Sequence, residues 1–155
     1  MPSTDYRSRF TGQVLGDQEV SHPTLADVVS GERHVHVVAR DEAHLAFLAE
    51  RPVRKGHVIV ATNAVVDSVA DLDDTAHAAL WQFVHTMQRR MRERLPCARV
   101  CVQVIGWAVR HAHVHLIPTD APGQVPGLDG EPLPVVEMVA LAKLLQDASS
   151  ESEDE

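Results

Sequence analysis

The alternation of apolar and polar positions along the chain predicts five short β-strands. Each candidate is five to seven residues long, rich in aliphatic or β-branched residues and bounded by turn-forming residues. Two of the boundaries are clusters that suit tight turns, the charged run at 40–42 and the Pro-to-Gly stretch at 52–56. The predicted strands are His34–Ala39, Leu45–Ala49, His57–Thr62, Arg99–Ile105 and Ala112–Ile117.

Between the third and fourth strands the apolar period changes to three or four residues, which predicts one long helix over Asp71–Leu95. Its apolar face comprises Ala76, Leu80, Phe83, Val84, Met87, Met91 and Leu95. Acidic residues suit its N-terminus, and Pro96 ends it. Four arginines near its C-terminus suit a solvated helix end better than a phosphate site; they are Arg89, Arg90, Arg92 and Arg94.

A shorter helix is predicted to begin after Pro134, beyond an irregular loop at 118–134 that holds five prolines and three glycines. Its apolar stripe comprises Val135, Met138, Val139, Ala142 and Leu145. Together these elements predict an α+β fold: a mostly antiparallel sheet of about five strands with one long and one shorter helix.

The 155 residues suffice for one domain with a substantial core. We expect an N-terminal arm at 1–33, a folded domain at 34–146 and a disordered acidic tail at 147–155. The formal charge is −8, but five acidic residues of the tail supply most of it, so the rest of the chain carries −3. A negative balance argues against nucleic acid as a partner.

The sequence also predicts a reduced, cytoplasmic protein that is not bound to a membrane. No apolar run approaches the length of a membrane span, and residues 1–10 lack the apolar core of a signal peptide. The two cysteines, Cys97 and Cys101, would lie on one face of a strand about 13 Å apart, which is too far for a disulfide.

The most informative feature is the run His111-Ala112-His113-Val114-His115, followed by Leu116-Ile117-Pro118. Residues two apart in a strand point to the same face, so the three imidazoles would line one surface of the sheet. Histidine can be a nucleophile, an acid, a base or a metal ligand near neutral pH. The shorter pair His34-Val35-His36, by contrast, is expected to be plain half-exposed strand.

The run resembles the signature of the histidine triad (HIT) superfamily of nucleotidyl hydrolases and transferases. A second stretch supports the resemblance, because Ala46-Phe47-Leu48 followed by Pro52 and Gly56-His57-Val58-Ile59-Val60 looks like the family's strand–turn–strand. The long helix falls between the two motifs in the family's order. The resemblance covers roughly residues 34–118.

The resemblance implies a role for each matching histidine. His113 would be the nucleophile that attacks the α-phosphorus of a nucleotide and forms a covalent nucleotidyl-histidine, which water then hydrolyses. His115 would contact the phosphate or help to protonate the leaving group, and His111 would orient the other two. His57 would support the triad from the neighbouring strand, or else be a plain histidine at a sheet edge. The family also implies a homodimer and no cofactor.

Three departures from the family's pattern concern sugar and phosphate contacts. Ala49 stands where members carry an Asp or Asn that hydrogen-bonds the ribose hydroxyls. Asn63 follows Thr62 where a Pro-Lys pair is common. Gln103 is the candidate to replace an asparagine often found before the triad.

The loop directly before the triad departs further. Members often carry Gly-Gln-Ser/Thr-Val there, whereas this chain has Gly106-Trp107-Ala108-Val109 and so lacks both polar side chains. Trp107 could offer a stacking surface for a substrate or close the end of the sheet as a core residue. Arg110 could supply positive charge, although strand alternation directs it away from the triad.

These observations predict a HIT-type enzyme that cleaves a phosphorus–nitrogen or phosphorus–oxygen bond of a small nucleotide, with a substrate choice shifted from ordinary adenosine nucleotides. Two alternatives stay open. One is a metal site built from the three histidines, although the outer two would lie about 13 Å apart. The other is a catalytically silent relative that binds a ligand or a partner, with the acidic tail as a docking segment.

Overall fold

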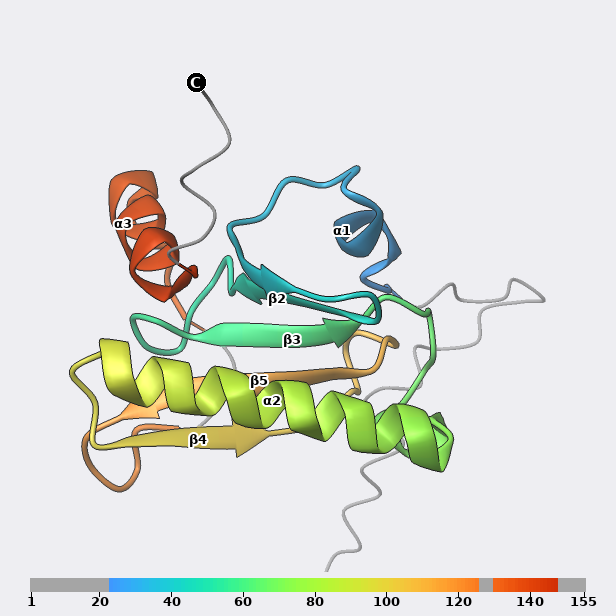
Figure 1. Cartoon of the computed structure of the whole chain (residues 1–155). Coiled ribbons are helices and arrows are strands. Elements are labelled where there is room, and N and C mark those ends of the chain that lie inside the picture. The colour runs from blue at the N-terminus through green and yellow to red at the C-terminus, as the bar shows by residue number, and fades with distance from the viewer. Residues whose placement is uncertain (1–22, 126–129, 148–155) are drawn as a thin grey trace, which may run out of the picture.

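The triad strand lies inside a five-stranded antiparallel sheet. The computed structural model describes residues 23–125 and 130–147. The sheet order is β1-β2-β3-β5-β4, so the strand that carries the histidines has a partner on each side (Figure 1). The α+β fold predicted from the sequence is confirmed. The strands are β1 Val37–Arg40, β2 His44–Leu48, β3 Val58–Thr62, β4 Arg99–Gln103 and β5 His113–Thr119.

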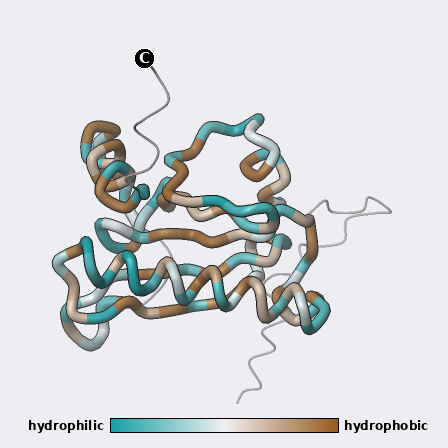
Figure 2. Tube along the Cα trace, in the orientation of Figure 1, coloured by the Kyte–Doolittle hydropathy of each residue, from teal (hydrophilic) through white to brown (hydrophobic). Residues whose placement is uncertain are grey.

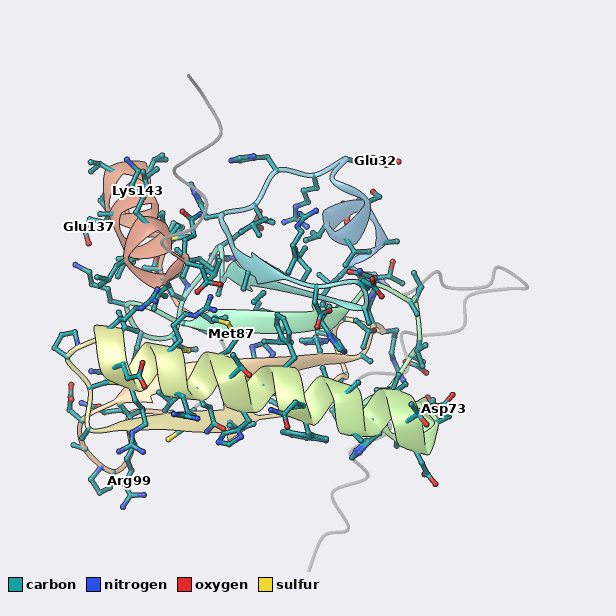
Figure 3. All side chains as sticks on the ribbon, viewed as in Figure 1. Glu32, Asp73, Met87, Arg99, Glu137 and Lys143 are labelled. Atoms are coloured by element: carbon teal, nitrogen blue, oxygen red, sulfur yellow. The ribbon has the colours of Figure 1, made fainter. Side chains whose placement is uncertain are left out.

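One face of the sheet carries the main apolar core. It is covered by α2 (Asp74–Arg94) and by α3 (Val135–Leu145), and α2 runs across the sheet in Figure 1. Met87 of α2, labelled in Figure 3, is completely buried. The apolar character of the underlying strands is visible in Figure 2, most clearly along β3. Alternate strand residues complete this layer, among them Val58, Val60, Val114 and Leu116.

The opposite face holds the histidines. Pairing across the sheet sets Ala61 opposite His113 and Ile59 opposite His115, so all four residues share this face. A smaller apolar cluster of Leu45, Phe47 and Ala61 lies on it beside Val28 of α1 (Ala26–Ser30). The α1 helix lies within residues 1–33, the segment predicted to be an N-terminal arm. The alternation of the sequence thus separates a helix-covered face from a reactive face.

Several strand boundaries differ from the sequence prediction. The predicted strand at 34–39 begins only at Val37, where the pairing with Phe47 of β2 starts. Just before it, the carbonyl of His36 accepts the N–H of Leu48, the last residue of β2. His34 and His36 therefore precede the strand, and the prediction that they form part of it is wrong. The predicted strand 99–105 ends at Gln103, where its pairing with β5 stops.

The triad strand is longer than predicted and includes a proline. Although residues from 118 onward were expected in a loop, β5 continues to Thr119. Proline cannot donate to a neighbouring strand, so it is tolerated only where no acceptor needs it. Pro118 pairs with Val100 on one side, while β3 on the other side begins only opposite Leu116. At Pro118, β5 therefore has a paired strand on one side only, as an edge strand does.

The long helix begins later than predicted. Residues Val69–Asp71 form a separate turn of 3₁₀-helix, capped by Ser68, and α2 starts at Asp74. Asp73 is its N-cap, with a carboxylate that accepts the N–H of Ala76 at 2.8 Å. Leu95 ends the helix directly before Pro96, as the sequence predicts.

The arginines at the end of α2 are not simply solvated, as the sequence suggested. Arg90 donates to the carbonyl of Leu145, and Arg94 donates to the carbonyls of Leu144 and Gln146. They cap the C-terminus of α3, where the helix dipole favours positive charge. Met138, Ala142 and Leu145 of the stripe predicted for α3 are buried, whereas Val135 and Val139 are exposed.

Two further features bear on the protein's setting. Cys97 and Cys101 are both free thiols. No helix within residues 23–125 and 130–147 is long and apolar enough to cross a membrane. The expected tail at 147–155 lies outside the described residues except for Asp147, as does the part of the expected arm before residue 23.

Candidate active site

The imidazoles of His113, His115 and His57 form one contiguous group on the reactive face. The ring centroids of His113 and His115 are 4.9 Å apart, and those of His115 and His57 are 5.2 Å apart. His57 immediately precedes β3, the neighbour of β5, which brings its ring against the triad. All three rings are at least 93 % buried, so each needs its polar atoms satisfied or directed at a ligand.

His113 is held by its own strand. Its Nδ1 lies 2.5 Å from the carbonyl oxygen of His111, and a carbonyl oxygen can only accept. The Nδ1 atom therefore carries the proton, and Nε2 keeps the lone pair in the neutral ring. Among the described residues no hydrogen bond occupies Nε2. The backbone thus presents an unprotonated nitrogen, which is the form that a nucleophile requires.

His115 and His57 form a hydrogen-bonded pair whose direction is set by the backbone. The N–H of Val53 donates to Nδ1 of His57 at 3.1 Å, so that atom is an acceptor. In the neutral ring the proton then lies on Nε2 of His57, which is 3.0 Å from Nδ1 of His115 and donates to it. His115 consequently carries its own proton on Nε2.

His111 is anchored at both ring nitrogens. Its Nδ1 accepts the N–H of Leu25 at 3.2 Å, and its Nε2 donates to the carbonyl oxygen of Thr62 at 2.6 Å. The side chain is fully buried. With both nitrogens engaged, His111 fastens the segment just before β5 to the end of β3 and to the segment before α1. Its carbonyl oxygen in turn accepts the hydrogen bond of Nδ1 of His113.

Burial keeps the reactive group uncharged. It lowers the pKa of His57 to about 4. Burial, together with the nearby His113 and His57, lowers the pKa of His115 to about 3. Burial also lowers the pKa of His113, although the hydrogen bond to the His111 carbonyl acts in the opposite direction. Near neutral pH the rings are therefore neutral, as the tautomers deduced from the hydrogen bonds require.

Gln103 is the predicted substrate residue that the sheet brings to the triad. It pairs with His115 across β4 and β5, so the two side chains share the reactive face. Its Oε1 is buried and has no hydrogen-bond partner in the part of the chain that the structure describes. A buried amide oxygen without a partner is costly unless a ligand supplies a donor.

Ala49 and Asn63 differ in their relation to the site. The N–H of Ala49 donates to the carbonyl of His57 at 2.9 Å, and its methyl group is buried. Asn63 is directed elsewhere, because its amide donates to the carbonyl of Glu42 and its own N–H to that of Ala43. This side chain ties the end of β3 to the β1–β2 turn and is not directed at the triad.

The loop before the triad places Trp107 at the surface. The residue is 38 % exposed, so the alternative of a core tryptophan is wrong. The guanidinium carbon of Arg110 lies 5.3 Å from the centroid of its ring, a cation–π contact. Ala108 is exposed and Val109 is half-buried on the same loop. The N–H of Arg110 bonds to Pro23, which fixes the loop just before His111.

A metal site built from the three histidines does not fit these contacts. Both ring nitrogens of His111 are already hydrogen-bonded to the backbone, which leaves that residue with no lone pair to offer. Within the described ranges no group of three or more histidine, cysteine or acidic side chains is arranged to hold an ion.

Several residues that shape the site could not be found from side-chain chemistry, because they act through the backbone. Val53 and Leu25 donate N–H groups, and Thr62 offers a carbonyl. Gly130 packs so closely on the turn at Pro52 that an added Cβ would lie 1.7 Å from the Pro52 carbonyl oxygen. A glycine in the Pro-rich loop is the one signal of this contact in the sequence.

Comparison with known proteins agrees with this geometry. The family model of the HIT domain matches residues 30–121, so the chain belongs to the HIT domain family. A curated relative, the nitrilase and fragile histidine triad fusion protein NitFhit of Caenorhabditis elegans, is 29 % identical over 91 residues. That match covers 56 % of this chain and 21 % of the relative, so the chain spans about a fifth of the relative's length.

Solved structures share the fold. A hypothetical histidine triad nucleotide-binding protein from Sulfolobus tokodaii has a TM-score of 0.71 at 20 % identity, over 78 % of this chain and 87 % of that one. A zinc-bound histidine triad family protein from Mycobacterium smegmatis has a TM-score of 0.64 at 22 % identity, over 84 % and 96 %. At these identities the likeness establishes the fold.

Proposed function

We propose that this protein is a HIT-type hydrolase or nucleotidyltransferase that cleaves a P–N or P–O bond of a small nucleotide through a covalent intermediate on His113. The observation that carries the proposal is the hydrogen bond from Nδ1 of His113 to the carbonyl of His111. This hydrogen bond leaves Nε2 of His113 unprotonated, on a strand that is paired with a neighbour on both sides. The nucleophile is therefore already positioned, and its attack on phosphorus needs little further ordering of the side chain.

The other imidazoles support the same reaction. In the proposed pose Nε2–H of His115 donates to a non-bridging oxygen of the phosphate, since its Nδ1 is occupied by His57. The buried oxygen of Gln103 accepts from the substrate on the same face. His111 acts as a positioning residue through its carbonyl. No cofactor takes part.

The chemistry follows in two displacements. The lone pair on Nε2 of His113 forms a bond to phosphorus, and the bond from phosphorus to the leaving group breaks with its electron pair. The proton of His113 stays on Nδ1 and keeps its hydrogen bond to the His111 carbonyl. This hydrogen bond stabilises the positive charge of the phosphorylated ring. Water then attacks phosphorus, the P–N bond returns its pair to Nε2, and one proton passes to solvent.

The substrate is expected to depart from ordinary adenosine nucleotides at the ribose. The buried methyl group of Ala49 cannot accept from sugar hydroxyls. Each such hydrogen bond contributes about 0.5–1.5 kcal/mol net, so their loss weakens recognition of the sugar. We therefore expect ribose and deoxyribose substrates to be used with similar efficiency.

The working protein is proposed to be a cytoplasmic homodimer. Strand β4 is an edge of the sheet, and it exposes Val102. The residues that directly follow the strand, Val104 and Ile105, are exposed as well. An apolar edge of this kind favours pairing with a second copy. The two free thiols suit a reducing compartment.

A catalytically silent binding protein is the second candidate, favoured by Ala49, Trp107 and Ala108, which replace the polar residues that the family often carries at these positions. A turnover assay separates the two. Wild type, His113→Asn and the control His85→Asn are assayed on dinucleoside polyphosphates and nucleoside phosphoramidates. His85 is an exposed residue of α2, outside the site. We expect activity in wild type and in the control and none in His113→Asn; equal activity in all three, or binding without turnover, would contradict the proposal.

A further inference from the structure

The direction of the hydrogen bonds behind His115 restricts which protonation state it can adopt. A backbone N–H is always a donor, so Val53 fixes Nδ1 of His57 as an acceptor. His57 must then present Nε2–H to Nδ1 of His115, at 3.0 Å. His115 is the last ring in this series of hydrogen bonds, and its single proton is left on Nε2.

This arrangement opposes a positively charged His115. Charging the ring would place a second proton on its Nδ1, directly against Nε2–H of His57. His57 could relieve the conflict only by moving its proton to Nδ1, where it would meet the N–H of Val53 at 3.1 Å. Because the amide cannot reverse, each protonation of His115 creates one donor–donor contact in a buried site. Burial of both rings acts in the same direction.

Within residues 23–125 and 130–147, the remaining groups of the site offer no acidic proton either. Nδ1–H of His113 is committed to the His111 carbonyl, and Nε2–H of His111 is committed to the Thr62 carbonyl. Gln103 is an amide, which does not act as an acid at neutral pH. On the loop before the triad, Ala108 presents a methyl group where the family often has a hydroxyl.

We infer that the enzyme is selective for phosphoric anhydrides, whose leaving group is a phosphate or a longer phosphate chain, over substrates that release an alkylamine. This rests on the proposed function and narrows its substrate class. When Nε2 of His113 bonds to the α-phosphorus, the bond to the bridging oxygen breaks, and its electron pair leaves on that oxygen as a stable phosphate anion. An alkylamine must instead gain a proton as it departs, and His115 supplies a hydrogen bond but no proton.

The test is a series of leaving groups on one nucleoside 5′-phosphate. The series comprises an anhydride with phosphate, esters of phenols of graded acidity, and a phosphoramidate of an alkylamine. We expect kcat/KM to fall steadily as the leaving group becomes more basic. The alkylamine substrate should be about 100-fold or more below the anhydride, because general acid catalysis is worth about 10²–10⁴-fold. A flat series would overturn the inference, whereas no turnover of any member would overturn the proposed function.

A pair of substitutions isolates the amide that sets the direction. Val53→Pro removes the backbone N–H. The control Val53→Ala also removes the valine side chain but keeps the N–H. We expect Val53→Pro to narrow the gap between anhydride and alkylamine substrates, and Val53→Ala to preserve it. An unchanged gap in a folded Val53→Pro variant would contradict the inference.

A spectroscopic measurement on the wild-type protein keeps the test independent of that variant's folding. With ¹⁵N-labelled histidine, long-range ¹H–¹⁵N spectra report which ring nitrogens carry protons. We expect His115 to be protonated at Nε2 alone near neutral pH, both in the free protein and with a nucleoside monophosphate bound. Protons on both nitrogens of His115 would overturn the inference.

Discussion

Substituting Gly130 by alanine is predicted to disturb the triad from outside it. The added Cβ would lie 1.7 Å from the carbonyl oxygen of Pro52 and 2.9 Å from the nitrogen of Val53, whereas real Cβ contacts stay above 3.0 Å. One of the two backbone segments must therefore move by about 1.3 Å, the difference between 3.0 and 1.7 Å, since close-packed atoms cannot interpenetrate. The N–H of Val53 that orients His57 lies in the affected turn.

The expected cost has two parts. Loss of the Val53–His57 hydrogen bond leaves a buried acceptor without a partner, which destabilises the protein by about 1–3 kcal/mol. For a chain of this size each kcal/mol lowers Tm by about 2–4 °C. A misplacement of about 1 Å in a supporting group can reduce kcat/KM by up to about 100-fold.

The assay compares Gly130→Ala with a control, Glu131→Ala, which introduces alanine at the adjacent exposed position. Thermal unfolding and kcat/KM on an anhydride substrate are measured for both. We expect losses in Gly130→Ala alone. If the two variants matched wild type in Tm and in kcat/KM, the turn at Pro52 would not be a support for His57.

Three further predictions follow from other parts of the structure. Because burial lowers the pKa of His57 to about 4 and that of His115 to about 3, against 6.5 when unfolded, the unfolded chain binds more protons at acidic pH. The contribution of these two neutral histidines to stability is complete above pH 6.5 and is lost as the pH falls toward 4 and 3. Tm measured across this range should therefore fall less in His115→Gln than in wild type. Equal slopes of Tm against pH would contradict the lowered pKa of His115. Ala49→Asn should raise the preference for ribose over deoxyribose substrates by about 2- to 12-fold, the equivalent of one hydrogen bond of about 0.5–1.5 kcal/mol; an unchanged ratio of kcat/KM would argue against a sugar contact there. Val102→Glu should convert a dimer to a monomer in light scattering, whereas Val65→Glu, at a residue 56 % exposed elsewhere, should not; a dimer that survives Val102→Glu would exclude β4 as the interface.

Features that depend on local pattern could be predicted from the sequence. The alternation at His111–His115 brings His113 and His115 to one face, and the period of three to four residues identifies α2. The Pro-to-Gly turn before His57 lets the third strand return beside the triad. In each case a short stretch of chain contains the information, because strand and helix periods are properties of neighbouring residues.

Features that depend on partners distant in the chain could not be predicted. The strand was expected to end before Pro118, since nothing in the sequence shows that β3 begins only opposite Leu116. The supporting N–H of Val53 is invisible to side-chain reasoning, because every residue but proline has one. Likewise, whether Trp107 lies in the core or at the surface depends on tertiary packing, and the structure exposes it.

Covalent catalysis at this site requires that Nε2 of His113 forms a bond to phosphorus. The most direct test is intact-protein mass spectrometry after brief mixing with nucleotide anhydrides and phosphoramidates, without acid in the workup. We expect a mass increase equal to one nucleotidyl group in wild type and in His85→Asn, and no such increase in His113→Asn. Turnover of substrate by wild type without such an adduct, or an adduct that persists in His113→Asn, would contradict covalent catalysis by His113.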